Sequence, residues 1–148
     1  MSTSNIETGK FIAQGFSVPT PAGTTGVYVT KISLFFKNKT ENSQIKLFVT
    51  EVVNNAPDPT LVVPYSEVFL DSSQVNTSTD TLAVTDFVFS SPIFLSSAKK
   101  YAFCLQSSGS EYSFWGATRG EKDLVTNTNL DTNPLLENLY YREINGTY

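Results

Sequence analysis

Residues 87–124 read FVFSSPIFLSSAKKYAFCLQSSGSEYSFWGATRGEKDL and carry the clearest structural signal of the chain. Apolar residues recur there at every second position, in the sets Phe87/Phe89, Ile93/Leu95 and Tyr101/Phe103/Leu105. A helix would place its apolar residues three or four positions apart, so this period of two predicts half-buried β-strands. We expect the stretch to form a run of short antiparallel strands.

The remainder of the 148 residues supports an all-β protein. Thr, Ser, Val, Asn and aromatic residues fill the segments in which a helical protein would carry Ala, Leu, Glu and Lys. Turn residues separate about eight apolar runs, at the spacing that is typical of sandwiches and barrels. We expect a single antiparallel β-sandwich, jelly-roll-like, over residues 11–148, preceded by a flexible N-terminal tail at residues 1–10.

Local patterns refine this expectation. The apolar positions of residues 27–36 change phase near Thr30, which predicts a β-bulge or a change of neighbouring strand at that point. Residues 54–59 contain Pro57 and Pro59, which cannot donate ladder hydrogen bonds, so we expect a surface loop there. Residues 71–80 are almost all polar and predict a long loop, whereas residues 135–141 are apolar enough for a closing edge strand.

Composition excludes several classes of function. The chain has no His, which removes imidazole-based catalysis and most zinc sites. Its net charge is −4 and its ten basic residues are scattered, so we expect no nucleic-acid partner, and no apolar run is long enough to cross a membrane. Phosphate-binding and dinucleotide motifs do not occur. We therefore expect no enzymatic activity, no catalytic residue, no cofactor and no metal ion.

The sequence contains two weaker site patterns, each of which ordinary polar surface also explains. Glu111 paired with Glu121 or Asp123 would suit a glycosidase, but their polar setting would not raise a carboxyl pKa. Residues 71–80 offer oxygen ligands without the regular order of a calcium loop. Surface charge and a solvated loop are the preferred interpretations. The single Cys104 excludes an intrachain disulfide, and its apolar neighbours predict a packed thiol.

The candidate binding residues lie at the end of the opening stretch. Trp115 with Tyr112 and Arg119 would offer a stacking platform for a sugar ring or for a side chain of a partner protein. The alternative is that Trp115 only covers one end of the sandwich. The charged residues flanking Gly120 suit a polar contact between proteins or a hydrated turn. The candidate set is Tyr112, Trp115, Arg119, Glu121, Lys122 and Asp123.

The order of segments along the chain resembles a β-sandwich module of tailed-bacteriophage structural proteins, chiefly baseplate and tail-fibre-associated polypeptides. The resemblance covers roughly residues 11–148 and rests on IAQGFSVP, VYVTKISLFFKNK, VNNAPDPTLVVPYSEVFLDSSQV, FVFSSPIFL, KKYAFCLQSS, YSFWGATRGEKDL and NLYYREINGTY. In that module an aromatic-rich strand precedes a Gly-Glu-Lys-Asp type turn, and an Asn-Gly-Thr-aromatic sequence follows later. Larger relatives continue beyond this last element.

The resemblance implies a virion component of a tail, baseplate or head decoration, which attaches to other virion proteins in a symmetric assembly. The alternative is a carbohydrate-binding module that recognises glycans of the host surface through Trp115 and its neighbours. Sandwich edges pair readily with other chains, and this property favours the attachment role.

Overall fold

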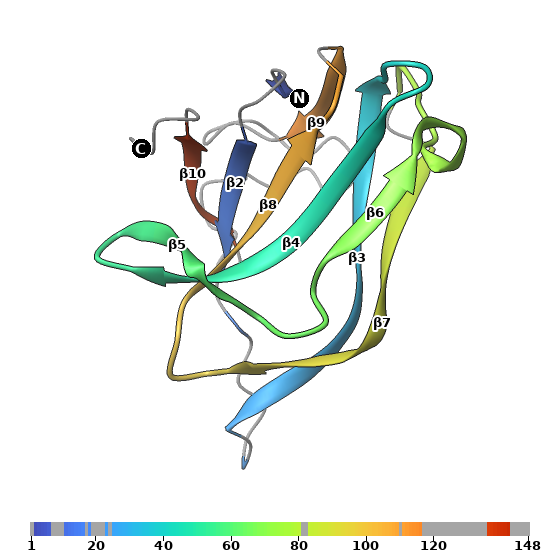
Figure 1. Ribbon diagram of the computed structural model, residues 1–148. Coiled ribbons are helices and arrows are strands. Elements are labelled where there is room, and N and C mark those ends of the chain that lie inside the picture. Colours follow the sequence, from blue (N-terminus) through green and yellow to red (C-terminus); the bar gives the residue numbers. More distant parts are fainter. Residues whose placement is uncertain are drawn as a thin grey trace.

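Strands form almost all of the regular structure among the described residues. The computed structural model describes residues 2–6, 11–16, 18, 23, 25–80, 83–109, 111–116 and 136–142. These residues include one short 3₁₀ helix, η1 (Ser72–Gln74), and ten strands (Figure 1). The strands are β1 (Ser2–Ile6), β2 (Phe11–Phe16), β3 (Gly26–Asn38), β4 (Gln44–Val53), β5 (Ala56–Val62), β6 (Val68–Asp71), β7 (Val84–Ser96), β8 (Tyr101–Ser107), β9 (Tyr112–Gly116) and β10 (Leu136–Arg142).

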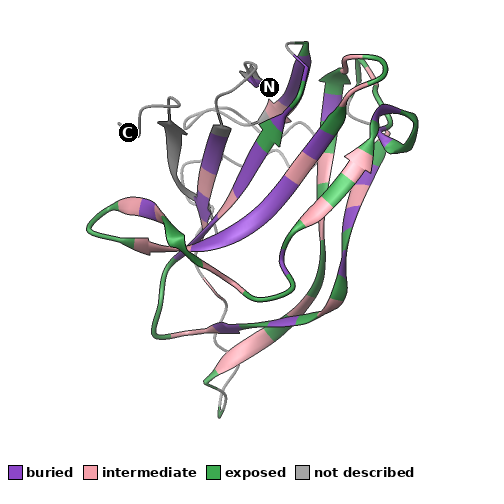
Figure 2. Ribbon diagram, in the orientation of Figure 1, coloured by how far each residue is buried: buried purple, intermediate pink, exposed green. Residues whose placement is uncertain are grey.

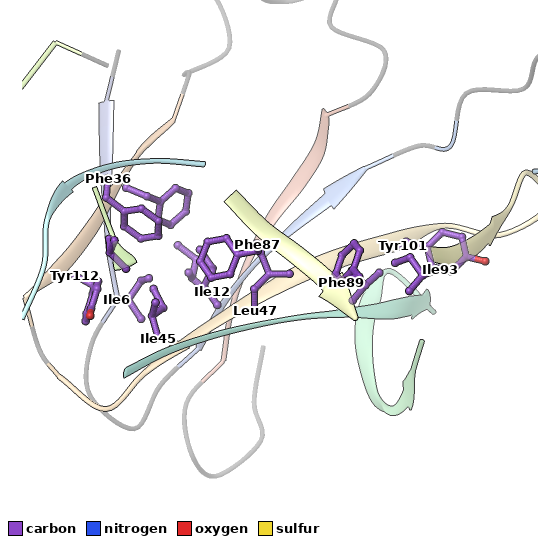
Figure 3. Packing of buried hydrophobic residues seen from close by; sticks show 14 of the residues in the cluster. Ile6, Ile12, Phe36, Ile45, Leu47, Phe87, Phe89, Ile93, Tyr101 and Tyr112 are labelled. Carbon is purple, nitrogen blue, oxygen red and sulfur yellow. The ribbon is translucent and has the colours of Figure 1, made fainter. Parts of the chain in front are cut away.

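The strands make two antiparallel sheets that enclose one main core. The four-stranded sheet has the order β1-β9-β3-β7, and the six-stranded sheet has the order β10-β2-β8-β4-β5, with β6 also paired to β4. Both sheets contribute to the same buried cluster, for example Phe87 from β7 and Leu47 from β4. Figure 3 shows this row of side chains, from Tyr112 and Phe36 at one end to Tyr101 at the other. The expected all-β antiparallel sandwich is confirmed.

The pairing of strands follows a simple rule. The first four strands pair with the later ones in reverse order: β1 with β9, β2 with β8, β3 with β7, and β4 with β5 and β6. The reversal occurs at Asn54 and Asn55, whose φ angles are 53° and 62°. Two positive φ angles define the tight hairpin turn that matches the twist of its strands, and Asn tolerates this conformation well. The chain therefore forms one long hairpin, and each of its two arms contributes strands to both sheets.

Alternation along β7 and β8 agrees with the sequence analysis. Phe87 and Phe89, and then Ile93 and Leu95, all belong to the core, as do Tyr101 and Leu105 on β8. The expected separate short strands around residues 87–95 are instead one strand of 13 residues. In its pairing with β3, Ile93 lies opposite Val29 and Val88 lies opposite Lys31. Residues 89–92 of β7 therefore have only Thr30 opposite them on β3. The expected irregularity near Thr30 is thus confirmed, and the additional residues come from the neighbouring strand.

The segment at residues 54–59 corrects an expectation. The loop is confined to Asn54 and Asn55, and β5 begins at Ala56 and includes Pro57 and Pro59. β5 is the outermost strand of its sheet, where one side of the backbone needs no ladder partner and the missing N–H of proline costs little. The prolines therefore mark an edge strand rather than the end of the sheet.

Both ends of the chain add outer strands. Residues 2–6, which the sequence analysis assigned to a tail, form β1 and pair with β9, and Ile6 is only 1% exposed. The mostly polar composition of residues 1–10 concealed the side chain of Ile6, which packs into the core. The expected closing edge strand is confirmed as β10, which lies beside β2.

Candidate interaction surfaces

Tyr112 does not belong to a surface site. Its side chain is fully buried in the core, and its ring meets Phe36 edge to face with 6.1 Å between the ring centroids. The Tyr112 hydroxyl donates a hydrogen bond to the carbonyl oxygen of Ser43 at 3.3 Å. Tyr112 and Trp115 are three residues apart on β9, and an odd separation along a strand puts side chains on opposite faces. The two residues cannot form one stacking platform.

Trp115 lies on the outer face of the four-stranded sheet and is half-buried. Its indole Nε1 donates to the carbonyl oxygen of Ser78 at 3.0 Å. The ammonium of Lys37 lies 5.5 Å from the ring centroid, within the range of a cation–π contact. The N–H group and one face of the indole are therefore already engaged within the chain.

The other four candidates, Arg119, Glu121, Lys122 and Asp123, lie outside the described residues. Their proposed role in a polar contact between proteins stays a prediction.

The structure adds an apolar surface that sequence reasoning missed. Five large apolar side chains are exposed on the outer face of β3 and β7. Figure 2 shows exposed positions alternating mostly with intermediate ones along β3 and with buried ones along β7. We name them the attachment face: Tyr28, Phe35, Val84, Val88 and Phe94. Tyr28 is 73% exposed, and Val88 is 59% exposed although valine is among the residue types most often buried.

Tyr28 and Phe94 hold one end of the attachment face in a fixed arrangement. The two residues are direct partners in the β3–β7 register, and their ring centroids are 5.2 Å apart. An aromatic cross-strand pair of this kind is stabilising and costs little side-chain entropy when it meets a partner. The sequence does contain a sign of this surface. In the alternating runs of β3 and β7, one set of positions faces the core, and the residues of the attachment face lie in the other set, where polar side chains are usual.

A small polar cluster divides the attachment face. The ammonium of Lys31 lies 2.9 Å from one carboxylate oxygen of Asp86, and the Ser33 hydroxyl donates to the other oxygen. The hydrogen bond from Ser33, followed by the hydrogen bond and charge of Lys31, lowers the pKa of Asp86 below its ordinary value of 3.8. The cluster leaves the surface with one positive and one negative charge, which compensate each other.

The Asp86 cluster predicts a small pH-dependent contribution to stability. The folded-state pKa is depressed, so the contribution is fully present above the ordinary pKa of an aspartate and is lost as the pH falls through the folded-state pKa. Asp86→Asn should lower the free energy of unfolding at neutral pH and have less effect as the solution is acidified. Urea unfolding of both proteins across this pH range measures the difference, and Ser33→Ala should reproduce part of it. An equal difference at neutral and acidic pH would contradict the assignment.

Other kinds of site have less support. The described residues contain no group of three or more Cys, Asp or Glu arranged to hold a metal ion. Cys104 is fully buried, as expected for a packed thiol. Within the described part of the chain, no helix has the length and apolarity needed to cross a membrane. The chain matches no family model, no curated protein and no solved structure.

Proposed function

We propose that this chain is a non-enzymatic structural module of a bacteriophage virion, which attaches to other virion proteins through its attachment face. The observation that carries the attachment role is the exposure of Tyr28, Val88 and Phe94 on one sheet face. Apolar side chains that gather on the surface of a soluble domain mark a site of contact with another protein. The virion assignment rests on the resemblance of the sequence to the phage module, and the absence of His supports a role without catalysis.

We also infer that the sandwich is of the jelly-roll type. The support is the pairing of the chain as one long hairpin, with the order β1-β9-β3-β7 in one sheet and β2-β8-β4-β5 in the other. Except for β4, β5 and β6, consecutive strands lie in different sheets, as two interlocked Greek keys require.

The alternative, glycan recognition through Trp115, has weaker support. A sugar that stacks on an indole needs an open ring face, and it gains from a free N–H donor. Lys37 covers one face of Trp115, and Ser78 accepts its N–H hydrogen bond. Trp115 is better suited to joining β9 and β3 to the segment that contains Ser78.

The attachment proposal predicts a strong effect of charge at Val88. Val88→Lys would place a second ammonium beside Lys31, the cross-strand partner of Val88, and Asp86 already compensates the charge of Lys31. Burying the added, unpaired charge against a partner protein is costly. We expect incorporation into particles to fall by about tenfold or more, because each 1.4 kcal/mol of lost affinity is a factor of about ten. Quantifying the tagged chain in purified virions, after expression in cells that produce them, measures incorporation.

Leu61→Lys is the matched control, because Leu61 is 40% exposed on β5, in the other sheet. Thermal unfolding of both variants should match the parent protein, since neither side chain is buried in the core. Normal incorporation of Val88→Lys, or an equal loss with Leu61→Lys, would refute the attachment face.

A further inference from the structure

Four cross-strand pairs of β3 and β7 point outward, and their chemistry is symmetric along the strands. An apolar pair lies at each end, and two pairs with a charged member lie between them. In order along the strands, the pairs are Tyr28 with Phe94, Lys31 with Val88, Ser33 with Asp86, and Phe35 with Val84. The attachment face therefore has the same order of apolar, charged and apolar regions in both directions.

A surface with this order is complementary to itself. When two copies meet face to face about a two-fold axis through the middle of the face, each apolar end meets an apolar end. The charged middle matches as well, because Lys31 of one copy lies beside Asp86 of the other, and symmetry repeats this pair. A different partner would have to match both apolar ends and both charges, whereas a second copy of the chain meets all of these conditions.

The charged cluster retains hydrogen-bonding capacity for a second copy. The Lys31 ammonium can donate more than one hydrogen bond, and its bond to Asp86 at 2.9 Å uses one. The Asp86 carboxylate accepts from Lys31 on one oxygen and from Ser33 on the other, and each oxygen has a further lone pair. The Lys31 and Asp86 side chains are 51% and 36% exposed, so a partner can reach both. Two copies would form a ring of alternating charges, in which each charge has an opposite neighbour.

The sheet edge beside the attachment face is protected against strand addition. β7 is the outer strand of its sheet, and Pro92 lies within the stretch that interrupts its pairing with β3. A proline on an edge strand and an irregular stretch both hinder the addition of another strand. A second copy therefore meets β3 and β7 through their outward side chains rather than by extending the sheet.

We propose that two copies of this chain associate face to face through the attachment face, about a two-fold axis that passes near Lys31 and Asp86. The inference rests on the proposed function, because it uses the same surface and names a second copy of the chain as the partner there. Tyr28 and Phe94, which already contact each other, supply aromatic rings of the kind that contribute strongly to protein interfaces. Because the contact covers parts of only two strands, we expect a dimer in equilibrium with the monomer.

The test reverses one charge of the cluster at a time. Lys31→Glu makes the cluster doubly negative, and Asp86→Lys makes it doubly positive. Each variant alone should associate about tenfold or more weakly than the parent chain, because like charges meet at the axis. An equimolar mixture of the two variants should regain association, since the negative face of one meets the positive face of the other. Sedimentation equilibrium of the parent, of each variant and of the mixture measures the dissociation constants.

Lys46→Glu and Phe69→Ala are the matched controls, because they make comparable changes in the six-stranded sheet. Lys46 forms an ion pair with Glu67, and Phe69 is 57% exposed. Both controls should leave association unchanged, whereas Tyr28→Ala should weaken it by about tenfold. A parent chain that stays monomeric at about 1 mM, a mixture that associates no more tightly than its two components, or equal weakening by the controls would overturn the dimer.

Failure of the dimer and failure of the virion role have different results. The purified chain meets no other virion protein, so its self-association tests the dimer alone. If the parent is monomeric and Val88→Lys still fails to enter particles, the dimer is wrong and the attachment face meets a different virion protein. If the mixture of charge-reversed variants associates but Val88→Lys enters particles normally, the dimer is correct and the virion role is wrong.

Discussion

Replacing Phe87 by alanine is expected to lower the free energy of unfolding by about 3–5 kcal/mol. Phe87 is fully buried in the middle of β7, and its ring centroid lies 6.2 Å from that of Phe36. The substitution removes apolar contacts between the two sheets and leaves a cavity that rigid sheets cannot close. Urea unfolding monitored by circular dichroism gives the difference, provided that the slope of free energy against urea concentration is unchanged.

Phe103→Ala provides the internal comparison. Phe103 also points inward, from β8, but it is half-buried and lines an apolar opening of about 190 Å³ at one end of the sandwich. Its removal enlarges a space that already exists, so the loss should be clearly smaller than for Phe87. Equal losses at the two positions, or a loss below about 1 kcal/mol at Phe87, would mean that the sheets do not pack as described.

Ile6→Ala is expected to lower the free energy of unfolding by about 2–5 kcal/mol. Ile6 is 1% exposed, at the end of β1, and is the partner of Tyr112 in the β1–β9 register. It packs into the same cluster as Phe36 and Phe87, although it comes from a segment with otherwise polar residues. The measurement therefore tests whether β1 stabilises the edge of the four-stranded sheet.

The control for Ile6 is Val84→Ala, which truncates an apolar side chain that is 40% exposed. Exposed positions of this kind usually change stability by less than about 0.5 kcal/mol. If Ile6→Ala were as mild as Val84→Ala, the sequence-based expectation of a flexible tail would be restored and β1 would contribute nothing to the fold.

The period-two pattern predicted the inward phase of the strands well, because burial between two sheets is what creates that pattern. It could not give the length of β7, since the register change opposite Thr30 depends on tertiary pairing. The loop expected at residues 54–59 was wrong because proline excludes only central strands, and a sequence does not reveal which strand is central.

The candidate site was predicted less well. Tyr112 and Trp115 are close in sequence, but their odd separation along β9 places their side chains on opposite faces of the sheet. The attachment face lies in the outward phase of β3 and β7. Outward apolar residues such as Val88 also support the prediction of a strand, and their exposure in the folded chain is what identifies them as surface residues.

The reversed pairing of the strands also determines when the protein can fold. The partner of β1 is β9, and the partner of β2 is β8, so each of these pairs closes a loop that spans most of the chain. Such high contact order is typical of proteins that fold in about milliseconds to seconds, because loop-closure entropy is lost before the distant contacts form. During synthesis neither sheet can be completed before β8 and β9 have left the ribosome. We expect pairing to begin at the tight turn at Asn54 and Asn55 and to proceed outward to the two ends of the hairpin.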